Sequence, residues 1–271
     1  MADIVSLHPE EQRGLVLKER ADAILRLTLN NPPTNALSIA MMERLIAELD
    51  AVAEMPDIRV VVLAAVGQVF SAGHDLKEIT SHRGDGDQGR AFFDKTVRLA
   101  TELMLRITRL PQPVIAEIDG LATAAGCQLV ASADLAVCTD TATFCTPGVN
   151  IGLFCSTPMV AVSRAAHRKQ AMEMLLTGET IDASTAKDFG LVNRIVPKQY
   201  LRQVVDKYAA VIASKSPEAV KIGKQAFYRQ AAMGLEEAYA FATEVMVENL
   251  LMEDALEGIG AFLGKRMPEW K

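Results

Sequence analysis

The stretch between residues 120 and 154 is poor in groups that transfer protons. It reads "GLATAAGCQLVASADLAVCTDTATFCTPGVNIGLF", and its only acidic residues are Asp134 and Asp140. The same stretch contains neither histidine nor lysine. Small residues allow the main chain to approach a ligand closely. The segment therefore predicts a site that works through backbone groups more than through titrating side chains.

Two segments are each predicted to pass from a buried strand through small residues into a helix. The first is "VVLAAVGQVFSAGHDLKEI" (61–79), with Asp75 close to the expected start of the helix, and the second is "PVIAEIDGLATAAGCQLV" (113–130). Backbone N–H groups at a helix N-terminus favour negative charge. Two of them converging on one oxygen would form an oxyanion hole, in which one donor contributes roughly 10²–10³ in rate. The alternative is that both are ordinary turns of a parallel sheet.

Several side chains near these turns have both a catalytic and a structural interpretation. His74 has a pKa suited to proton transfer, but it could equally face solvent. Asp140 fits a turn at the end of a strand, and Asp119 fits a turn cap. Cys155 is expected to be a small buried apolar residue more than a nucleophile. Glu117 lies in a strand, facing an unknown side.

Other motifs lead to no site. "GDGDQG" (84–89) matches a dinucleotide fingerprint, but it follows "TSHR" where the fingerprint requires an apolar strand, so we expect a flexible loop. The histidines lack the spacing of metal ligands, and we expect no metal. "VFSAG" lacks the first glycine of a nucleophile elbow, which argues against Ser71 as a catalytic serine.

The elements that must position the two turns alternate between strand and helix up to about residue 200. This alternation predicts a layered α/β core with parallel crossovers over residues 1–200. After residue 200 only helical segments are expected. Residues 201–271 are therefore predicted to form a helical tail that packs on another surface. The strands are expected in "GLVLKER", "AILRLTLN", "IRVVVLAAV", "PVIAEIDG" and "DLAVCT", and the helices at 38–54, 91–110, in "AAGCQLVASA", and at 198–213, 217–232, 234–251 and 253–264.

Composition excludes several classes of protein. The net charge of −6 argues against a nucleic-acid surface, and no apolar run is long enough for a membrane span. The beginning, "MADIVSLHPEEQRG", is unlike a signal or transit peptide. The cysteines contain no C-x-x-C pair, which favours free thiols in a reducing compartment. These observations together predict a cytoplasmic protein.

Several segments, in order along nearly the whole chain, resemble the crotonase (enoyl-CoA hydratase/isomerase) superfamily. They are "FSAGHDLKE", "IAEIDGLATAAGCQLVASAD", "LTGETIDASTAKDFGLVNRIVP" and "EGIGAFLGKRMPEW". Two stretches, "GLATAAGCQLVAS" and "TPGVNIGLFCSTP", are most similar to one particular branch of it. The resemblance implies an α/β crotonase fold of repeated ββα units with a helical C-terminal oligomerisation region, assembled as a homotrimer or a dimer of trimers.

The resemblance also implies a set of site residues. The backbone N–H groups of His74 and Ala125 would hold the oxygen of an acyl-CoA thioester, with coenzyme A entering as part of the substrate and no permanently bound cofactor. Phe262 and Lys265 match positions that reach the adenine and phosphates of coenzyme A, although Lys265 could also simply complement a helix dipole. The implied substrate-binding residues are Ala72, His74, Asp75, Leu76, Lys77, Ala125, Gly126, Phe262 and Lys265.

The chain departs from the superfamily at both of its catalytic glutamates. Gln128 and Gly148 stand at those positions, and neither can exchange a proton. General acid–base groups contribute roughly 10²–10⁴ each, so classical hydration should be weak or absent. Two hypotheses follow: a CoA-thioester enzyme of the hydratase/isomerase group with altered chemistry, or a non-catalytic acyl-CoA-binding oligomer. A third, RNA binding, conflicts with only three basic residues in 198–213.

Overall fold

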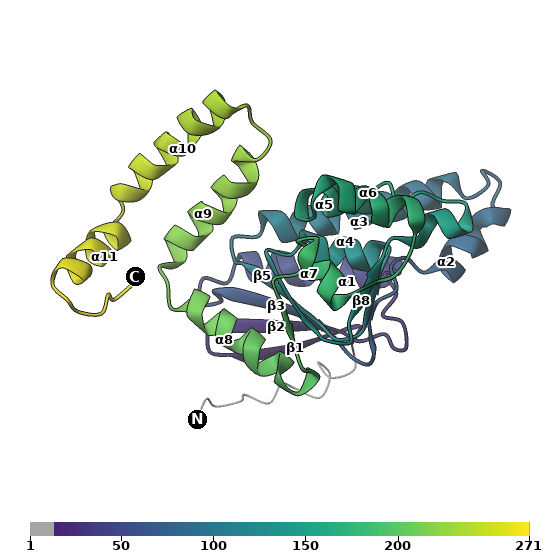
Figure 1. Ribbon diagram of the computed structural model, residues 1–271, viewed down its shortest axis with the longest axis horizontal. Coiled ribbons are helices and arrows are strands. Elements are labelled where there is room, and N and C mark those ends of the chain that lie inside the picture. Colours follow the sequence, from purple (N-terminus) through teal and green to yellow (C-terminus); the bar gives the residue numbers. More distant parts are fainter. Residues whose placement is uncertain (1–13, 271) are drawn as a thin grey trace.

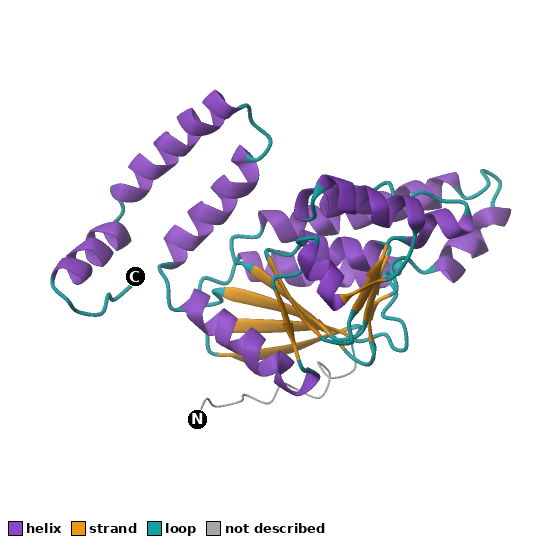
Figure 2. Cartoon of the chain, in the orientation of Figure 1, coloured by secondary structure: helices purple, strands orange, loops and turns teal. Residues whose placement is uncertain are grey.

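The core is built from three successive strand pairs that are shared between two sheets. The structure, a computed structural model, describes residues 14–270. The first strand of each pair lies in a six-stranded sheet of order β1-β2-β3-β5-β7-β10, and the second lies in a four-stranded sheet of order β4-β6-β8-β9. Figure 2 shows the two sheets at an angle, with helices outside them. The pairs are β3 (Val60–Ala65) with β4 (Val69–Ser71), β5 (Val114–Ile118) with β6 (Leu121–Thr123), and β7 (Leu135–Thr139) with β8 (Thr143–Cys145).

The other elements complete the two layers and the tail. The remaining strands are β1 (Val16–Ala21), β2 (Ile24–Leu29), β9 (Ile181–Asp182) and β10 (Arg194–Val196). The helices are α1 (Ile39–Ala53), α2 (Leu76–Ser81), α3 (Arg90–Arg109), α4 (Ala125–Ser132), α5 (Pro158–Ala165), α6 (Arg168–Thr177), α7 (Ala183–Asp188), α8 (Leu201–Ala213), α9 (Pro217–Gln230), α10 (Leu235–Leu250) and α11 (Glu253–Leu263). Three short 3₁₀ helices are η1 (His82–Gly84), η2 (Pro147–Ile151) and η3 (Lys198–Tyr200).

The first predicted elements are confirmed. β1 and β2 form an antiparallel hairpin, with Ala21 opposite Ile24. The side chain of Ser38 accepts a hydrogen bond from the Met41 amide and thereby caps α1. β3 pairs in parallel with both β2 and β5, as its nearly continuous run of β-branched residues predicts.

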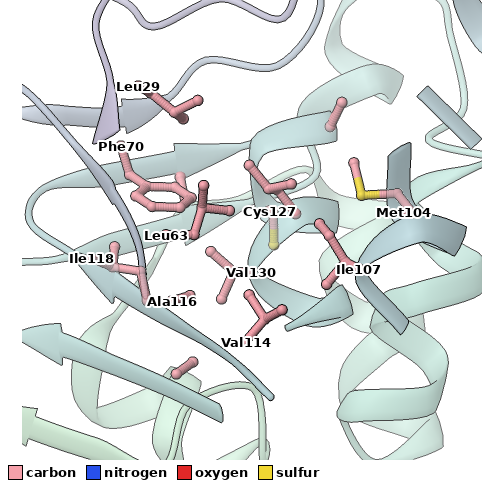
Figure 3. Packing of buried hydrophobic residues seen from close by; sticks show 14 of the residues in the cluster. Leu29, Leu63, Phe70, Met104, Ile107, Val114, Ala116, Ile118, Cys127 and Val130 are labelled. Atoms are coloured by element: carbon pink, nitrogen blue, oxygen red, sulfur yellow. The ribbon is translucent and has the colours of Figure 1, made fainter. Parts of the chain in front are cut away.

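One large apolar cluster holds the two sheets and α1, α3 and α4 together. Figure 3 shows Leu63 and Phe70, from the first strand pair, close to Cys127 and Val130 of α4. Phe70 and Cys127 are fully buried. Burying apolar surface contributes roughly 25 cal/mol per Å², and this cluster therefore fixes α4 relative to the strands that precede it.

The tail leaves the core after α8. Leu201, Val205 and Ala209 of α8 pack on the six-stranded sheet in a second apolar cluster. The boundary expected at residue 200 thus precedes a helix that lies on the core. Helices α9, α10 and α11 then extend away from the sheets, and α11 lies at the opposite end of the molecule from α2 (Figure 1).

Candidate functional site

The two strand-to-helix turns lie directly against each other. A Cβ atom added at Gly73 would lie 2.9 Å from the Ala125 amide nitrogen and 3.0 Å from the Ala124 Cβ. A Cβ added at Gly126 would lie 2.2 Å from the Ser71 carbonyl oxygen. Only glycine permits approaches this close. The small residues that the sequence concentrates here therefore bring the loop after β4 onto the N-terminus of α4.

Two amides at this junction are free to donate. Among residues 14–270, neither the His74 nor the Ala125 amide donates a hydrogen bond to a backbone or side-chain acceptor. Ala125 is the first residue of α4, and its amide is among those that a helix leaves unpaired. The preceding residue, Ala124, has φ 52° and ψ −119°, a rare conformation for a residue with a side chain. Backbone strain of this kind clusters at functional sites.

The His74 imidazole beside these amides is kept neutral. Burial lowers its pKa, and the nearby main chain of Leu37 opposes this shift only in part. Its Nδ1 is buried and has no hydrogen-bond partner among the described residues. The Leu37 amide donates to the Gly73 carbonyl at 2.8 Å, which holds the turn against the start of α1. The imidazole is therefore a neutral group of the site at pH 7, and among residues 14–270 it forms no ion pair with a carboxylate.

Gln128 lies in the first turn of α4, and Thr146 follows a residue that is hydrogen-bonded to the chain just before that helix. The backbone N–H of Gln128 donates to the Ala124 carbonyl oxygen, one helical turn earlier. The Ala124 amide donates to the Cys145 carbonyl at 3.0 Å, and Thr146 follows Cys145. The Gln128 side chain is 4% exposed and Thr146 is fully buried. Neither the Gln128 Oε1 nor the Thr146 Oγ1 has a hydrogen-bond partner among the described residues. Sequence analysis missed Thr146, because a lone threonine after a short strand carries no signal.

A neighbouring loop lies against Gly148, the second position at which the resemblance implies an acid in the superfamily. A Cβ at Gly148 would lie 3.0 Å from the Cys155 Sγ, 3.1 Å from the Leu153 carbonyl oxygen and 3.2 Å from the Cys155 amide nitrogen. Burial raises the pKa of the Cys155 thiol, so this side chain is a protonated, apolar group at neutral pH. A side chain at position 148 would therefore require this loop to shift by a few tenths of an ångström.

The other predicted substrate residues fall into two groups. Asp75 caps α2, because its carboxylate accepts from the amides of Lys77 at 2.9 Å and Glu78 at 3.2 Å. Ala72, Leu76 and Lys77 flank it, next to His74. Phe262, in contrast, is 83% exposed on α11, and Lys265 follows it at the far end of the tail (Figure 1). The structure does not bring these two residues together with His74 in one chain.

The remaining candidates have structural partners. Glu117 pairs with Arg26, and Asp119 pairs with Lys198 at 2.7 Å. In "GDGDQG", the Asp87 carboxylate accepts from the Gly89 and Ala91 amides and so supports the start of α3. Two cavities, of about 10 Å³ in the core and about 440 Å³ beside the α8–α9 junction, are not lined by the predicted site residues. In residues 14–270 no cluster of histidine, cysteine or acidic residues is arranged to hold a metal ion.

Comparison with known proteins identifies the family. The enoyl-CoA hydratase/isomerase family model matches residues 19–271. The chain is 46% identical to the mitochondrial enoyl-CoA hydratase domain-containing protein 3 of Rattus norvegicus, over 97% of this chain and 86% of the rat protein. An enoyl-CoA hydratase structure from Mycobacterium smegmatis superposes with TM-score 0.91 and 48% identity, over 95% and 99% of the two chains. The structure of human enoyl-CoA hydratase domain-containing protein 3 superposes with TM-score 0.90 and 44% identity, over 95% and 100%.

The chain belongs to the enoyl-CoA hydratase/isomerase family. Its α/β architecture of repeated ββα units with a helical C-terminal region is the crotonase fold, as the sequence resemblance predicts. The branch that "GLATAAGCQLVAS" and "TPGVNIGLFCSTP" resemble is that of the domain-containing protein 3 relatives, and this prediction is also confirmed.

The expectation of a cytoplasmic protein is wrong. The similar proteins from rat, Xenopus laevis, mouse and human are all named as mitochondrial. The four cysteines are free and buried, but reduced thiols occur in more than one compartment and do not distinguish between them. The expectation drawn from the N-terminal stretch falls almost wholly on residues 1–13, outside the described residues. No helix within residues 14–270 combines the length and apolarity needed to cross a membrane.

Proposed function

We propose that this protein binds acyl-CoA thioesters and holds the thioester oxygen between the backbone amides of His74 and Ala125. The observation that carries the proposal is the direct packing of two strand-to-helix turns, each with a backbone amide that has no acceptor among residues 14–270. Membership of a family named for enoyl-CoA chemistry supports it. Coenzyme A enters and leaves as part of the substrate, and no permanent cofactor is needed.

Classical hydration should be weak in this chain. The two positions at which the resemblance implies glutamates in the family's hydratases are Gln128, whose amide does not titrate, and Gly148, where an added Cβ would lie 3.0 Å from the Cys155 Sγ. Each general acid or base contributes roughly 10²–10⁴. The proposed reaction is therefore one that needs stabilisation of a thioester enolate but little proton transfer from side chains.

A non-catalytic acyl-CoA-binding oligomer is the second candidate. The observation in its favour is the same loss of both acids, since an intact oxyanion site without proton-transfer groups can bind a thioester and leave it unchanged. Turnover of crotonyl-CoA, 3-hydroxybutyryl-CoA and acetoacetyl-CoA separates the two candidates. Binding without conversion of any of them favours the second.

We also propose assembly as a homotrimer or a dimer of trimers. The tail exposes large apolar side chains, among them Leu251 (76% exposed) and Phe262 (83%), and patches of this kind mark interaction surfaces. Phe262 and Lys265 would then reach coenzyme A bound to another copy of the chain. Light scattering should give a mass three or six times the chain mass of 29.3 kDa; a monomer at micromolar concentration would contradict the assembly.

The variant Gly73→Ala tests the oxyanion site. The added Cβ would lie 2.9 Å from the Ala125 nitrogen, in the space where the thioester oxygen is proposed to bind. Gly67→Ala is the matched control, because Gly67 has φ +84° against +81° for Gly73 but no atom within 4 Å of the added Cβ. Both variants place an alanine at a similar positive φ, and only Gly73→Ala brings the new Cβ against residues 123–125.

Calorimetry with butyryl-CoA provides the measurement. We expect Gly73→Ala to weaken binding by about a hundredfold or more, equivalent to about 2.7 kcal/mol or more, while Gly67→Ala retains the wild-type affinity. Equal affinities in both variants would contradict the proposed position of the thioester oxygen.

A further inference from the structure

The cavity of about 440 Å³ lies between the core and the start of the tail. Three parts of the chain enclose it: the segment from the end of α1 to the start of β3 (53–59), the segment before β5 (111–113) and the α8–α9 junction (212–221). Its volume is within the range of cavities that hold small organic molecules. None of the predicted substrate-binding residues lines it, so a molecule bound here would be additional to the thioester.

The walls of this cavity are held in place by the chain itself. Gln112 Nε2 donates to the carbonyl oxygens of Val52 and Met55 at 3.0 and 3.3 Å, which joins the end of α1 to the segment before β5. Arg59 Nη1 donates to the Ala213 carbonyl oxygen at 3.0 Å, which joins the start of β3 to the end of α8. Proline has a fixed φ, and four lining residues are prolines: Pro56, Pro111, Pro113 and Pro217. A ligand therefore has little of the chain to order when it binds.

The side-chain donors that remain available in the cavity are cationic. Arg59 keeps guanidinium N–H groups beyond the one that it uses, Lys215 has its whole ammonium, and neither forms an ion pair among residues 14–270. Lys221, the third cation of the lining, lies 3.6 Å from the Glu218 carboxylate. Glu54 is the other acid, so three cations face two acids, although the whole chain has a net charge of −6. This local excess favours a ligand with a single negative charge.

The rest of the lining is largely aliphatic. Besides the prolines and Ala53, it contains Ile58, Ile212 and Val220. Covering apolar surface with an apolar group is favourable, whereas placing a second charge or several hydroxyls against it leaves those groups without partners. The cavity thus matches a molecule that has one anionic head group and an apolar body.

We propose that this cavity binds an aliphatic monocarboxylate. The carboxylate is held by Arg59 and Lys215, since guanidinium and ammonium groups form short, charge-assisted hydrogen bonds to carboxylates. The aliphatic chain lies against Ile58, Ile212 and Val220. Because Arg59 belongs to the core and Lys215 to the α8–α9 junction, the bound anion links the core to the tail.

Calorimetry and the fluorescence of Trp270 test this site with octanoate as the probe. Trp270 is the only tryptophan, and its Nε1 donates to the carbonyl oxygen of Ser214, which precedes Lys215. We expect octanoate to bind and to change the fluorescence in parallel. Octanol has the chain without the charge and acetate has the charge without the chain, so each should bind at least about tenfold more weakly. Octanoate binding that is absent, that leaves Trp270 unchanged or that octanol equals would overturn the proposal.

A competition experiment separates this site from the thioester site. The affinity for octanoate should be the same with and without saturating butyryl-CoA, because the cavity contains neither His74 nor Ala125. Displacement of octanoate by butyryl-CoA would place both in one site and overturn the proposal. If butyryl-CoA itself does not bind, the proposed function fails, and the octanoate titration still decides the present inference.

Variants assign octanoate binding to the two cations. Arg59→Met should weaken it by about tenfold and Lys215→Met by about threefold, as for an exposed ion pair. Lys207→Met is the matched control, since Lys207 is an exposed lysine of α8 outside the cavity, and it should retain the wild-type affinity. Equal affinities in all three variants would overturn the assignment.

Filling the cavity gives an independent test that leaves its charges in place. Val220→Phe enlarges a lining side chain and should weaken the binding of octanoate by about tenfold or more, since a filled cavity cannot hold the chain. Val211→Phe is the control, because Val211 is 51% exposed and does not line the cavity. Circular dichroism confirms that each variant is folded. Unchanged octanoate affinity in a folded Val220→Phe variant would place the ligand elsewhere and overturn the proposal.

Discussion

Two of the regions that bury polar side chains in this molecule treat them in opposite ways. At the base of the tail, the Lys224 ammonium donates to the carbonyl oxygens of Ile107 and Gln112 and to the Asp134 carboxylate, at 3.0, 2.9 and 2.7 Å. Asp134 also accepts from the Val114 amide and the Tyr228 hydroxyl. All three Lys224 donors are used. Near the N-terminus of α4, in contrast, the buried Gln128 Oε1 and Thr146 Oγ1 have no hydrogen-bond partner among residues 14–270.

The difference separates a structural network from a candidate binding site. A fully satisfied network is complete without any other molecule, and here it joins α9 to the core. Unsatisfied groups cost the fold roughly 1–3 kcal/mol each, a cost that a ligand can offset. Buried polarity alone therefore does not indicate function in this chain.

The largest loss of stability is expected when the hydrogen-bond network around Lys224 and Asp134 is broken. Lys224→Met would leave the Asp134 carboxylate half-buried without its ion pair, and breaking such a pair typically costs about 3–5 kcal/mol. Urea unfolding should show this loss. Lys221→Met on the same helix is the control, because Lys221 forms only an exposed pair with Glu218 at 3.6 Å and should change stability by less than about 1 kcal/mol. Similar losses for both variants would contradict the structural role of Lys224.

A smaller loss of stability is expected at Gly148, which the neighbouring loop contacts closely. Gly148→Glu must displace the loop that contains Leu153 and Cys155, and overpacking of this kind costs about 1–3 kcal/mol. Gly86→Glu, where nothing lies within 4 Å of the new Cβ, serves as the control and should be nearly neutral.

The same substitution should fail to create a hydratase. We expect crotonyl-CoA hydration by the double variant Gln128→Glu with Gly148→Glu to stay near the wild-type rate, because the loop prevents the second carboxylate from taking its place. A gain of about 10²-fold or more, the contribution of a working acid–base group, would show that the pocket is otherwise intact.

Two fully buried threonines, one with hydrogen-bond partners for its hydroxyl and one without, test what those partners contribute to stability. Thr146→Val removes a hydroxyl without partners, so stability should stay within about 0.5 kcal/mol of the wild type or rise. Thr139→Val removes a hydroxyl that lies 3.4 Å from Asp119 Oδ1 and 3.3 Å from Thr141 Oγ1, and should cost about 1 kcal/mol. Equal losses in urea unfolding would mean that the Thr146 hydroxyl has a partner in solution.

The smallest change in stability is expected from the Glu257–Arg266 ion pair at the exposed end of the tail. Glu257 accepts from Arg266 and from the Glu269 amide, and the Arg266 guanidinium holds the pKa of Glu257 at about 2, below its usual 4.5. Since the folded-state pKa is lowered, this stabilisation is complete above 4.5 and is lost as the pH falls toward 2. Trp270, the only tryptophan, donates to the Ser214 carbonyl at 2.8 Å and reports the change.

Fluorescence should therefore be constant from pH 7 to 5 and change only in that acidic window, and Glu257→Gln should show an altered spectrum already at pH 7. If Glu257→Gln has the same spectrum as the wild type, Trp270 fluorescence does not depend on this ion pair, and the prediction is wrong.

Most of the long elements were predictable from the sequence, and the second sheet was not. The periodic helices α1, α3 and α8–α11 and the apolar strands β3 and β5 carry clear patterns. Strands β4, β6 and β8 have three residues each, too few for any period to be visible. They are nonetheless the strands that bring the two turns together, so the sequence predicted both turns without the sheet that aligns them.

The site was predictable to the extent that it lies in local chain segments. Small residues and the family resemblance indicated His74, Ala125, Gln128 and Gly148. The position of Cys155 against Gly148 depends on the path of a loop, and the missing partners of Thr146 depend on every neighbour in space. Neither property is encoded in a motif of contiguous residues.

A crystal structure with butyryl-CoA tests the central claim most directly. The account predicts the thioester oxygen at about 2.7–3.1 Å from both the His74 and the Ala125 amide nitrogens, the range of an oxyanion hole. A thioester oxygen that meets neither amide, with the acyl chain bound elsewhere on the protein, would contradict it.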